Sequence, residues 1–297
     1  MVNISRRGFL AGTAAAAAAL TVNVIRAEDA PKAAAETVKK CFPDGFPTGI
    51  LGKTGLKTSI LGMGTGMSNG NPYINMGEAA FCELMHRGFD QGVRYVDTAQ
   101  NYRTHMYVQR ALRGWNREDF HILTKTPSRT EDRVKGDIDR YLYELNTGYL
   151  DTLLMHCMFS GNWPTELAGP WNVLQNAKKE GKVRSVGVSC HHLDALKACL
   201  EVDDLDVVLA RINPFGVDYV MDDATEKVVP VLKALHEKGV GVIAMKVFGE
   251  GKCTEAAQRR ESLEFVTGLE CVDIMTIGFT KTSEVDETIG MLAEILG

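Results

Sequence analysis

Four polar residues in the first half of the chain stand at the ends of short apolar segments, or just after one, and could together move a proton. Asp97 ends residues 95–97, Tyr102 follows five residues later, and Lys125 and His156 end two further segments. A nearby ammonium lowers the pKa of a phenol from its usual value near ~10 because it favours phenolate. With Asp97 holding Lys125, Tyr102 would donate a proton to a carbonyl oxygen as hydride arrives, or accept one in reverse, while His156 orients the carbonyl.

Each of these residues also has a purely structural explanation. Asp97 could cap a following helix, and Lys125 could be a solvated loop charge. His156 could be a hydrogen-bonded core histidine, and Tyr102 an interface aromatic. The chemical interpretation requires that all four side chains meet in space, which depends on the elements that carry them.

From residue 50 onward, short apolar runs alternate with amphipathic stretches. The runs lack polar alternation, which is typical of strands buried on both faces of a parallel sheet. We expect strands at 60–63, 95–98, 121–124, 152–156, 185–189, 207–212, 240–245 and 274–278, and helices at 78–91, 132–145, 226–238 and 284–296. The third of these helices carries Pro230, which we expect in its first turn.

Strands that alternate with helices indicate an α/β fold built of βαβ units. About eight such units in about 240 residues favour a closed (β/α)₈ TIM barrel. An open doubly wound sheet is the alternative, but residues 62–67 (GMGTGM) lack the G-x-G-x-x-G spacing. Residues 50–57 predict an N-terminal β-hairpin that plugs the N-terminal mouth of the barrel. The C-terminal strand ends face the other mouth, where Asp97, Lys125 and His156 would converge.

Several segments around these residues resemble the aldo-keto reductase family. They are 92–102 (GVRYVDTAQNY), 123–126 (LTKT), 149–156 (YLDTLLMH) and 181–189 (GKVRSVGVS). The resemblance covers about residues 49–297. It implies a (β/α)₈ barrel that reduces aldehydes and ketones with NADPH and without a metal. It also implies a catalytic tetrad of Asp97, Tyr102, Lys125 and His156, with Tyr102 as the acid.

The resemblance further implies where the nicotinamide would lie. Ser189 corresponds to the family's serine on the carboxamide, whereas Cys190 replaces an Asn and Leu209 replaces a Gln. A thiol cannot donate and accept like an amide. Met245 stands where many members carry an aromatic on the nicotinamide, and a thioether can still cover a ring face.

Two glycine- or hydroxyl-rich segments suit the phosphates. The glycines of 248–252 would let backbone N–H groups approach a pyrophosphate. The start of the last helix, with its hydroxyls and Lys281, suits a further phosphate, although Ser283 could simply be an N-cap. We expect NADP, with NAD as the alternative, held by Ser189, Cys190, Met245, Lys246, Phe248, Gly249, Gly251, Gly278, Thr280, Lys281, Thr282, Ser283 and Glu287.

The N-terminus resembles a bacterial twin-arginine export signal. Arg6 and Arg7 precede an apolar run over 11–25, which is shorter than the ~20 residues that a spanning helix needs. A membrane anchor or a chance basic-apolar segment is the alternative. We expect a signal peptide at 1–27, a linker at 28–48 and the barrel at 49–297. The protein would pass the twin-arginine translocase without stable membrane insertion and be periplasmic or secreted.

Composition excludes some other classes. The formal net charge is -5 and no basic run follows the first ten residues, which argues against nucleic-acid binding. The seven cysteines form no C-x-x-C pair, so we expect neither a metal nor an iron–sulfur centre.

Three functions remain open: a reductase or dehydrogenase of a small carbonyl or sugar, a non-catalytic binding subunit, and a lyase or isomerase that recycles tightly bound nucleotide. Substrate specificity would depend on residues 69–75, 159–169 and 215–223. Trp163 and Trp171 either line the pocket or pack the loop.

Overall fold

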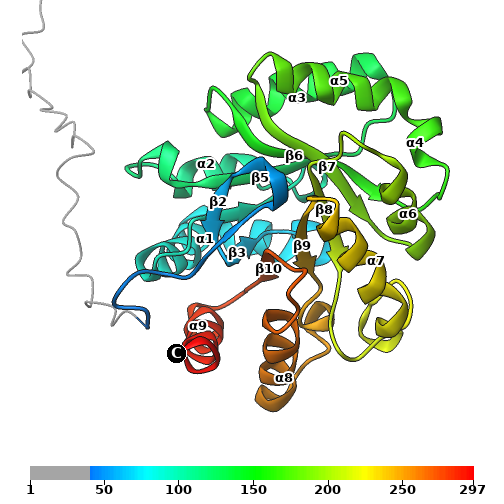
Figure 1. Ribbon diagram of the computed structural model, residues 1–297. Coiled ribbons are helices and arrows are strands. Elements are labelled where there is room, and N and C mark those ends of the chain that lie inside the picture. Colours follow the sequence, from blue (N-terminus) through cyan, green and yellow to red (C-terminus); the bar gives the residue numbers. More distant parts are fainter. Residues whose placement is uncertain (1–40) are drawn as a thin grey trace, which may run out of the picture. The chain divides into compact units, whose positions relative to one another are not determined.

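The computed structural model describes residues 41–297, so the expected signal peptide and most of the expected linker lie outside the described residues. Eight parallel strands close into a barrel in the order β10-β3-β4-β5-β6-β7-β8-β9 (Figure 1). Closure occurs where β10 pairs with β3, which rules out the open sheet. The barrel strands are β3 (Leu61–Gly64), β4 (Tyr95–Asp97), β5 (His121–Thr126), β6 (Leu150–Met158), β7 (Val183–Cys190), β8 (Val207–Arg211), β9 (Gly241–Met245) and β10 (Ile274–Gly278).

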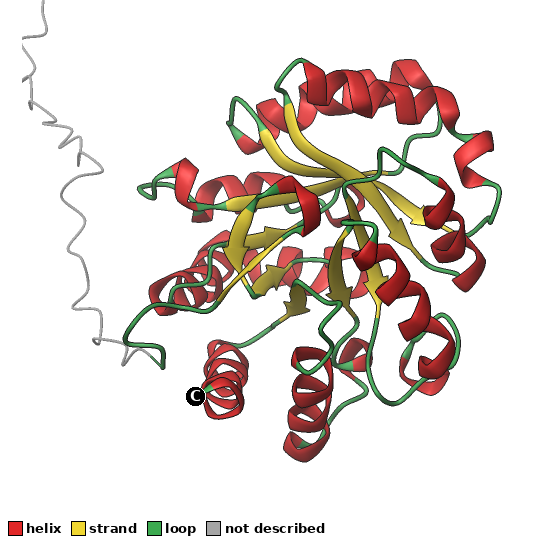
Figure 2. Ribbon diagram, in the orientation of Figure 1, coloured by secondary structure: helices red, strands yellow, loops and turns green. Residues whose placement is uncertain are grey.

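Helices connect the strands and surround the barrel (Figure 2). Each turns an apolar stripe inward; α3, for example, buries Val134, Ile138, Tyr141 and Leu145. The helices are α1 (Asn71–Gln91), α2 (His105–Ala111), α3 (Glu131–Leu145), α4 (Trp163–Glu166), α5 (Ala168–Lys179), α6 (Leu193–Ala198), α7 (Thr225–Glu237), α8 (Ala256–Thr267) and α9 (Thr282–Leu296).

Two helices differ from the sequence prediction at their starts. Helix α1 begins at Asn71 and kinks at Gly77 (φ 82°), so residues 71–75, expected in a loop, are helical. Pro230 lies in the second turn of α7 and not in the first, because the helix begins at Thr225. Pro230 has no N–H, so the carbonyl of Glu226, four residues earlier, lacks its usual helical donor. Both residues are exposed, so this carbonyl lies at the solvent boundary.

The predicted hairpin is present and closes the N-terminal mouth. Strands β1 (Thr48–Ile50) and β2 (Lys57–Ser59) pair antiparallel around a 3₁₀ turn, η1 (Gly52–Thr54). Leu51 is fully buried among side chains of the barrel interior. The N–H of Gly52 donates to Asp273 at 3.2 Å, and the N–H of Lys53 donates to the Gly239 carbonyl at 2.7 Å. Asp273 and Gly239 lie just before β10 and β9, so the plug is attached to the strands that close the barrel.

The core has two layers. A small cluster fills the barrel, and a larger one lies between the strands and the helices. In residues 41–297, none of the helices combines the length and the apolar character that crossing a bilayer would require.

Candidate active site

The four tetrad residues lie together in one pocket at the C-terminal mouth of the barrel. Asp97 ends β4, Lys125 belongs to β5 and His156 to β6, and Tyr102 ends the 3₁₀ helix η3 (Gln100–Tyr102) that follows β4. Parallel strands bring their carboxyl ends to one edge, which explains how residues far apart in sequence meet.

The Lys125 side chain is buried and makes an ion pair and hydrogen bonds. Its side chain is 1% exposed, and its Nζ donates to Asp97 Oδ1 at 2.5 Å and to the Thr98 carbonyl at 2.9 Å. The solvated-charge interpretation of Lys125 is therefore wrong. Burial lowers the pKa of Lys125, and the Asp97 carboxylate opposes this effect. The buried charge persists because it is paired and hydrogen-bonded.

Tyr102 does not have the acidified phenol that the sequence predicted. The Lys125 ammonium lies 5.0 Å from the centroid of the Tyr102 ring, over its face, and is already paired with Asp97. Burial raises the pKa of the Tyr102 phenol well above its usual value, and the Asp97 charge raises it further. The phenol therefore holds its proton at neutral pH, as a proton donor must. Gly66 makes room for it, since a Cβ there would lie 2.6 Å from the Tyr102 ring.

His156 lies beside Tyr102 on an irregular part of β6. Its Nε2 is 3.4 Å from the Tyr102 hydroxyl. The pairing of β6 with β7 shifts register between Met155 and Met158, and Cys157 adopts a positive φ of 60°. Bulges of this kind re-aim side chains beside active sites. The Arg129 guanidinium donates to the His156 carbonyl at 2.5 Å and so fixes the irregular backbone.

The imidazole of His156 is neutral. Burial lowers its pKa to about 2, and the Lys125 charge adds to that effect. Its Nδ1 is buried and has no hydrogen-bond partner among residues 41–297. The N–H of a neutral imidazole beside the phenol can donate a hydrogen bond to a carbonyl oxygen without adding charge to the pocket.

At the end of β7, Ser189 lies where the sequence predicted, but Cys190 does not. Ser189 lines the pocket and accepts the Cys157 N–H at 2.8 Å. Cys190 instead points into the outer core, with its Sγ 3.7 Å from Cys199 Sγ, and is absent from the pocket lining. The expected cofactor contact of Cys190 is therefore not possible in this arrangement. Side chains alternate along a strand, so His191 lies on the pocket side with Ser189.

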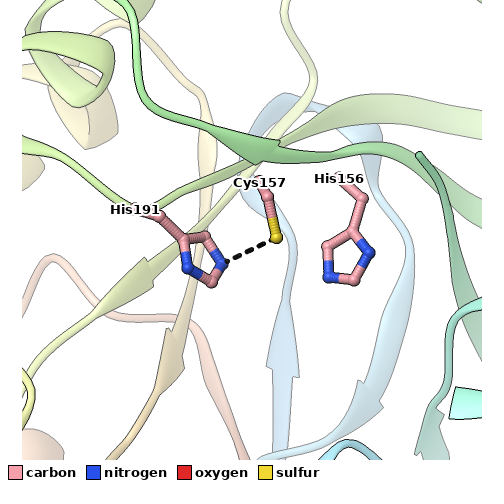
Figure 3. Close-up of side chains that lie close together, drawn as sticks. All are labelled: His156, Cys157 and His191. Atoms are coloured by element: carbon pink, nitrogen blue, oxygen red, sulfur yellow. Dashed lines mark hydrogen bonds between the residues drawn. The ribbon is translucent and has the colours of Figure 1, made fainter. Parts of the chain in front are cut away.

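His191 was not predicted from the sequence, and it belongs to a compact cluster with His156 and Cys157 (Figure 3). Its Nε2 is 3.5 Å from Cys157 Sγ. Its Nδ1 is 2.6 Å from Nη2 of Arg211, the last residue of β8. Burial and the Arg211 charge lower the pKa of His191 to about 3, so this imidazole is neutral too.

The segment after β9 forms one wall of the pocket. Six of the residues expected to contact cofactor line the pocket: Ser189, Met245, Lys246, Phe248, Gly251 and Gly278. Gly249 is buried but packs beside Tyr219, outside the lining. The N–H groups of Gly249 and Gly251 donate to turn carbonyls at 2.8 and 3.1 Å, so they are not free for a pyrophosphate as expected.

The start of α9 is also arranged differently from the prediction. The Glu284 carboxylate accepts the N–H groups of Thr280 at 2.7 Å and Lys281 at 3.2 Å. The N-cap is Lys281, which places Ser283 inside the first turn. Thr280, Lys281, Thr282, Ser283 and Glu287 are all outside the pocket lining.

Near this helix start, Glu287 forms an ion pair with Arg259 at 2.8 Å. No sequence pattern indicated Arg259, on α8, as a cation near α9, because only the fold brings these two helices together.

The pocket suits a flat, partly apolar ring. Gly64 and Gly278 leave room where a Cβ would lie 2.8 Å from Thr276 Oγ1 and from the Tyr73 hydroxyl respectively. Met245 and Leu209 supply apolar surface, and the buried hydroxyl of Thr276 lacks a partner within residues 41–297. These features fit a nicotinamide with its carboxamide.

Trp163 and Trp171 do not line the pocket. Both are buried and pack edge to face with ring centroids 5.8 Å apart. Each indole N–H is satisfied, by the Ala195 carbonyl and by Asp204. They pack the segment between β6 and α5.

A closed (β/α)₈ barrel with a pocket of titratable side chains at its C-terminal mouth is the architecture of a TIM-barrel enzyme. Residues 60–295 match the model of the aldo/keto reductase family, and the chain belongs to that family of oxidoreductases.

Three known proteins illustrate the relationship. The chain is 28% identical over 223 residues to L-galactose dehydrogenase of Arabidopsis thaliana, covering 69% of this chain and 66% of that protein. It is 23% identical over 237 residues to D-threo-aldose 1-dehydrogenase of a Pseudomonas species, covering 68% and 70%. Its fold matches the holo form of an aldo-keto reductase from Bacillus halodurans with a TM-score of 0.69, 19% identity and coverage of 83% and 91%. The chain thus spans about two thirds of the length of these two dehydrogenases.

Proposed function

We propose that this protein reduces a small aldehyde, ketone or sugar carbonyl, or oxidises the corresponding alcohol, with a nicotinamide cofactor and Tyr102 as general acid or base. The observation that carries the proposal is the position of the Tyr102 hydroxyl, 3.4 Å from His156 Nε2 in one pocket that Lys125 and Asp97 also line. A positioned proton donor of this kind contributes roughly 10²–10⁴ to a rate.

The cofactor, when bound, supplies or accepts the hydride. The protein's own residues would do the rest. Tyr102 would hold a proton toward the carbonyl oxygen, and His156 would hydrogen-bond the same oxygen and fix its direction. The Asp97 carboxylate would hold the Lys125 ammonium over the face of the phenol ring, 5.0 Å from its centroid, and so fix the surroundings of the proton donor. Met245 and Leu209 would cover the nicotinamide, and Ser189 would contact its carboxamide.

We propose NADP as the cofactor, with NAD as the alternative. Lys281 is exposed at the start of α9, and Arg259 lies nearby on α8, paired with Glu287. These two cations support a phosphate on the adenosine side. Because Glu284 occupies the N–H groups of Thr280 and Lys281, the recognition would depend on side chains and not on the helix backbone.

We also propose that the protein is exported by the twin-arginine route. The support is the sequence of residues 1–27, which lie outside the described residues. This route carries folded proteins, so the cofactor would be acquired in the cytoplasm and retained.

The direct test is hydride transfer from labelled cofactor. Purified protein is incubated with a panel of small aldehydes and ketones and with NADPH or NADH deuterated at C4. Deuterium at the carbinol carbon of the product, with matching cofactor oxidation, is the expected result. Substrate conversion without net cofactor oxidation would instead indicate the lyase or isomerase. Nucleotide binding without any turnover would indicate the binding subunit.

A further inference from the structure

The Asp97 carboxylate has a separate donor for each of its two oxygens. Oδ1 accepts from the Lys125 ammonium at 2.5 Å, and Oδ2 accepts from the Tyr95 hydroxyl at 3.2 Å. Tyr95 stands two residues before Asp97 on β4 and is fully buried. The tetrad therefore makes a contact deeper in the barrel, with a residue that is not one of its four members.

The position of the Tyr95 ring follows from the strands around it. Side chains two residues apart lie on the same face of a strand, so Tyr95 and Asp97 both face the barrel interior. On β3, Gly62 pairs with Tyr95 and leaves the space that the ring takes, since a Cβ at Gly62 would lie 2.1 Å from it. On β5, His121 packs edge-on against the ring, with centroids 5.6 Å apart. The ring is thus fixed between two neighbouring strands.

The hydroxyl of Tyr95 is the part of this side chain that packing does not explain. A phenylalanine would fill the same space, and burying a hydroxyl is unfavourable unless it is hydrogen-bonded. Burial raises the pKa of Tyr95 well above its usual value, and the Asp97 charge raises it further, so the phenol keeps its proton and donates. Because a carboxylate only accepts hydrogen bonds, this hydroxyl is a suitable partner for the buried Asp97.

Two donors on different oxygens determine how the Asp97 carboxylate is oriented. The χ2 torsion of an aspartate has broad preferences and does not by itself fix the plane of the carboxylate. With Oδ2 held by Tyr95, Oδ1 is left for Lys125, whose ammonium lies 5.0 Å from the centroid of the Tyr102 ring. Without the Tyr95 hydroxyl, the carboxylate would be free to turn, and the ammonium would shift with it.

We propose that Tyr95 is a positioning residue for proton transfer: it fixes the Asp97 carboxylate, which holds the Lys125 ammonium over the ring of the proton donor Tyr102. Tyr95 is outside the pocket lining, so it acts through Asp97 and not on the substrate or the cofactor. The inference rests on the proposed reductase function. It adds a fifth residue, one layer deeper in the barrel, on which the rate of that reaction depends.

The test removes the hydroxyl and keeps the ring. Tyr95→Phe retains the packing against Gly62 and His121, so the barrel should still form. The rate of a single turnover with saturating NADPH and aldehyde, measured by stopped flow, should fall roughly three- to tenfold, which is part of the tenfold or more that one hydrogen bond to a charged group contributes. The Kd of NADPH and the KM of the aldehyde should stay the same, because Tyr95 contacts neither.

Ser185→Ala is the matched control. Ser185 also carries a fully buried hydroxyl, which bonds the Thr152 hydroxyl at 2.7 Å and the Asp151 carbonyl at 2.8 Å and does not reach the tetrad. Both variants should lower the urea midpoint, since each loses a buried hydrogen bond. Tyr95→Phe alone should slow the single turnover. An equal loss of rate in Ser185→Ala would overturn the inference, because any loosening of the barrel interior would then have the same effect.

A second comparison asks whether Tyr95 acts through the ion pair. Asp97→Asn/Lys125→Met removes both charges, and its slow turnover is followed over long incubations. Adding Tyr95→Phe to this variant should change the remaining rate by less than about twofold, because the groups that Tyr95 orients are gone. A further loss as large as in the wild-type background would overturn the inference.

A crystal structure of Tyr95→Phe is the direct readout. It should show the Asp97 carboxylate turned and the Lys125 ammonium displaced from the face of the Tyr102 ring. An unchanged Asp97 and Lys125, or an unchanged single-turnover rate, would overturn the inference while leaving the reductase function intact. Absence of turnover in wild type would overturn both.

Discussion

The Lys125 ammonium donates to the Asp97 carboxylate at 2.5 Å while lying over the face of the Tyr102 ring, 5.0 Å from its centroid. The charge that would acidify the phenol is therefore compensated by a neighbour that raises its pKa. The site as arranged favours a protonated Tyr102, which suits carbonyl reduction more than alcohol oxidation at neutral pH.

Replacing Tyr102 by Phe should remove the proton donor and lower kcat/KM for carbonyl reduction by roughly 10²–10⁴. Nucleotide affinity should change little, because the hydroxyl acts on the substrate oxygen. Steady-state kinetics and nucleotide fluorescence titration measure the two effects. Near-normal turnover in Tyr102→Phe would mean that another group donates the proton.

Replacing Lys125 by Met should destabilise the protein more than Asp97→Asn/Lys125→Met does. The single variant leaves Asp97 buried without a partner, which typically costs about 3–5 kcal/mol, whereas the double variant removes both charges. Urea denaturation of the three proteins measures this difference. Equal stability of the single and double variants would contradict the importance of the ion pair.

Acid should destabilise the folded protein through its buried histidines. Burial lowers the pKa of His156 to about 2 and of His191 to about 3, from the usual 6.5. Below pH 6.5 these histidines become protonated in the unfolded chain but stay neutral in the folded chain. The free energy of unfolding therefore decreases as the pH falls toward those values. The slope is about 1.4 kcal/mol per pH unit for each histidine.

Urea midpoints between pH 7 and pH 4 test this dependence. The free energy of unfolding of His156→Gln should fall less steeply with decreasing pH than that of wild type, by about the slope that one histidine contributes. Parallel curves for the two proteins would mean that His156 titrates normally when folded.

Lys281→Ala should weaken NADPH binding several-fold and leave NADH binding almost unchanged, because an exposed charge pair contributes about 0–1 kcal/mol. Dissociation constants for both nucleotides are measured by fluorescence titration, with Lys252→Ala on the neighbouring loop as a control for overall charge. An equal effect on NADH would place Lys281 away from any 2′-phosphate.

Replacing Arg6 and Arg7 by Lys should leave folded protein in the cytoplasm, as judged by cell fractionation and protease resistance. Wild type purified from the periplasm should release near-stoichiometric NADP(H) on denaturation. A nucleotide at 1,000 times its Kd stabilises the native state by about 4 kcal/mol, which favours export of the loaded form. Folded but empty periplasmic protein would argue against retention, and wild type confined to the cytosol would argue against export.

The fold was predictable because its evidence is local. Most of the barrel strands were short apolar runs, and four of the helices had an amphipathic pattern, so the number of strands and their alternation with helices could be predicted. Lys125 and His156 could be assigned to one mouth without coordinates, since parallel strands place their ends together.

What the sequence could not provide were distances and directions. The pKa of Tyr102 depends on whether the Lys125 ammonium lies at the Tyr102 hydroxyl or is paired with Asp97. Cys190 was expected at the cofactor but points into the outer core, whereas His191 was not expected and lines the pocket. The alternation of side chains along a strand could have predicted both directions from the position of Ser189. Arg211 and Arg259 act through contacts between separate elements, for which no single segment carries a pattern.

The hairpin plug ties the beginning of the barrel to its end. Gly52 and Lys53 hydrogen-bond residues just before the last two strands, more than 180 residues later in the chain. During synthesis, residues 48–59 must therefore wait for β9 and β10 to leave the ribosome before they can dock. Docking of the plug therefore requires that the chain be made at least as far as the start of β10. A polypeptide that ended before β9 would lack part of the barrel interior that buries Leu51.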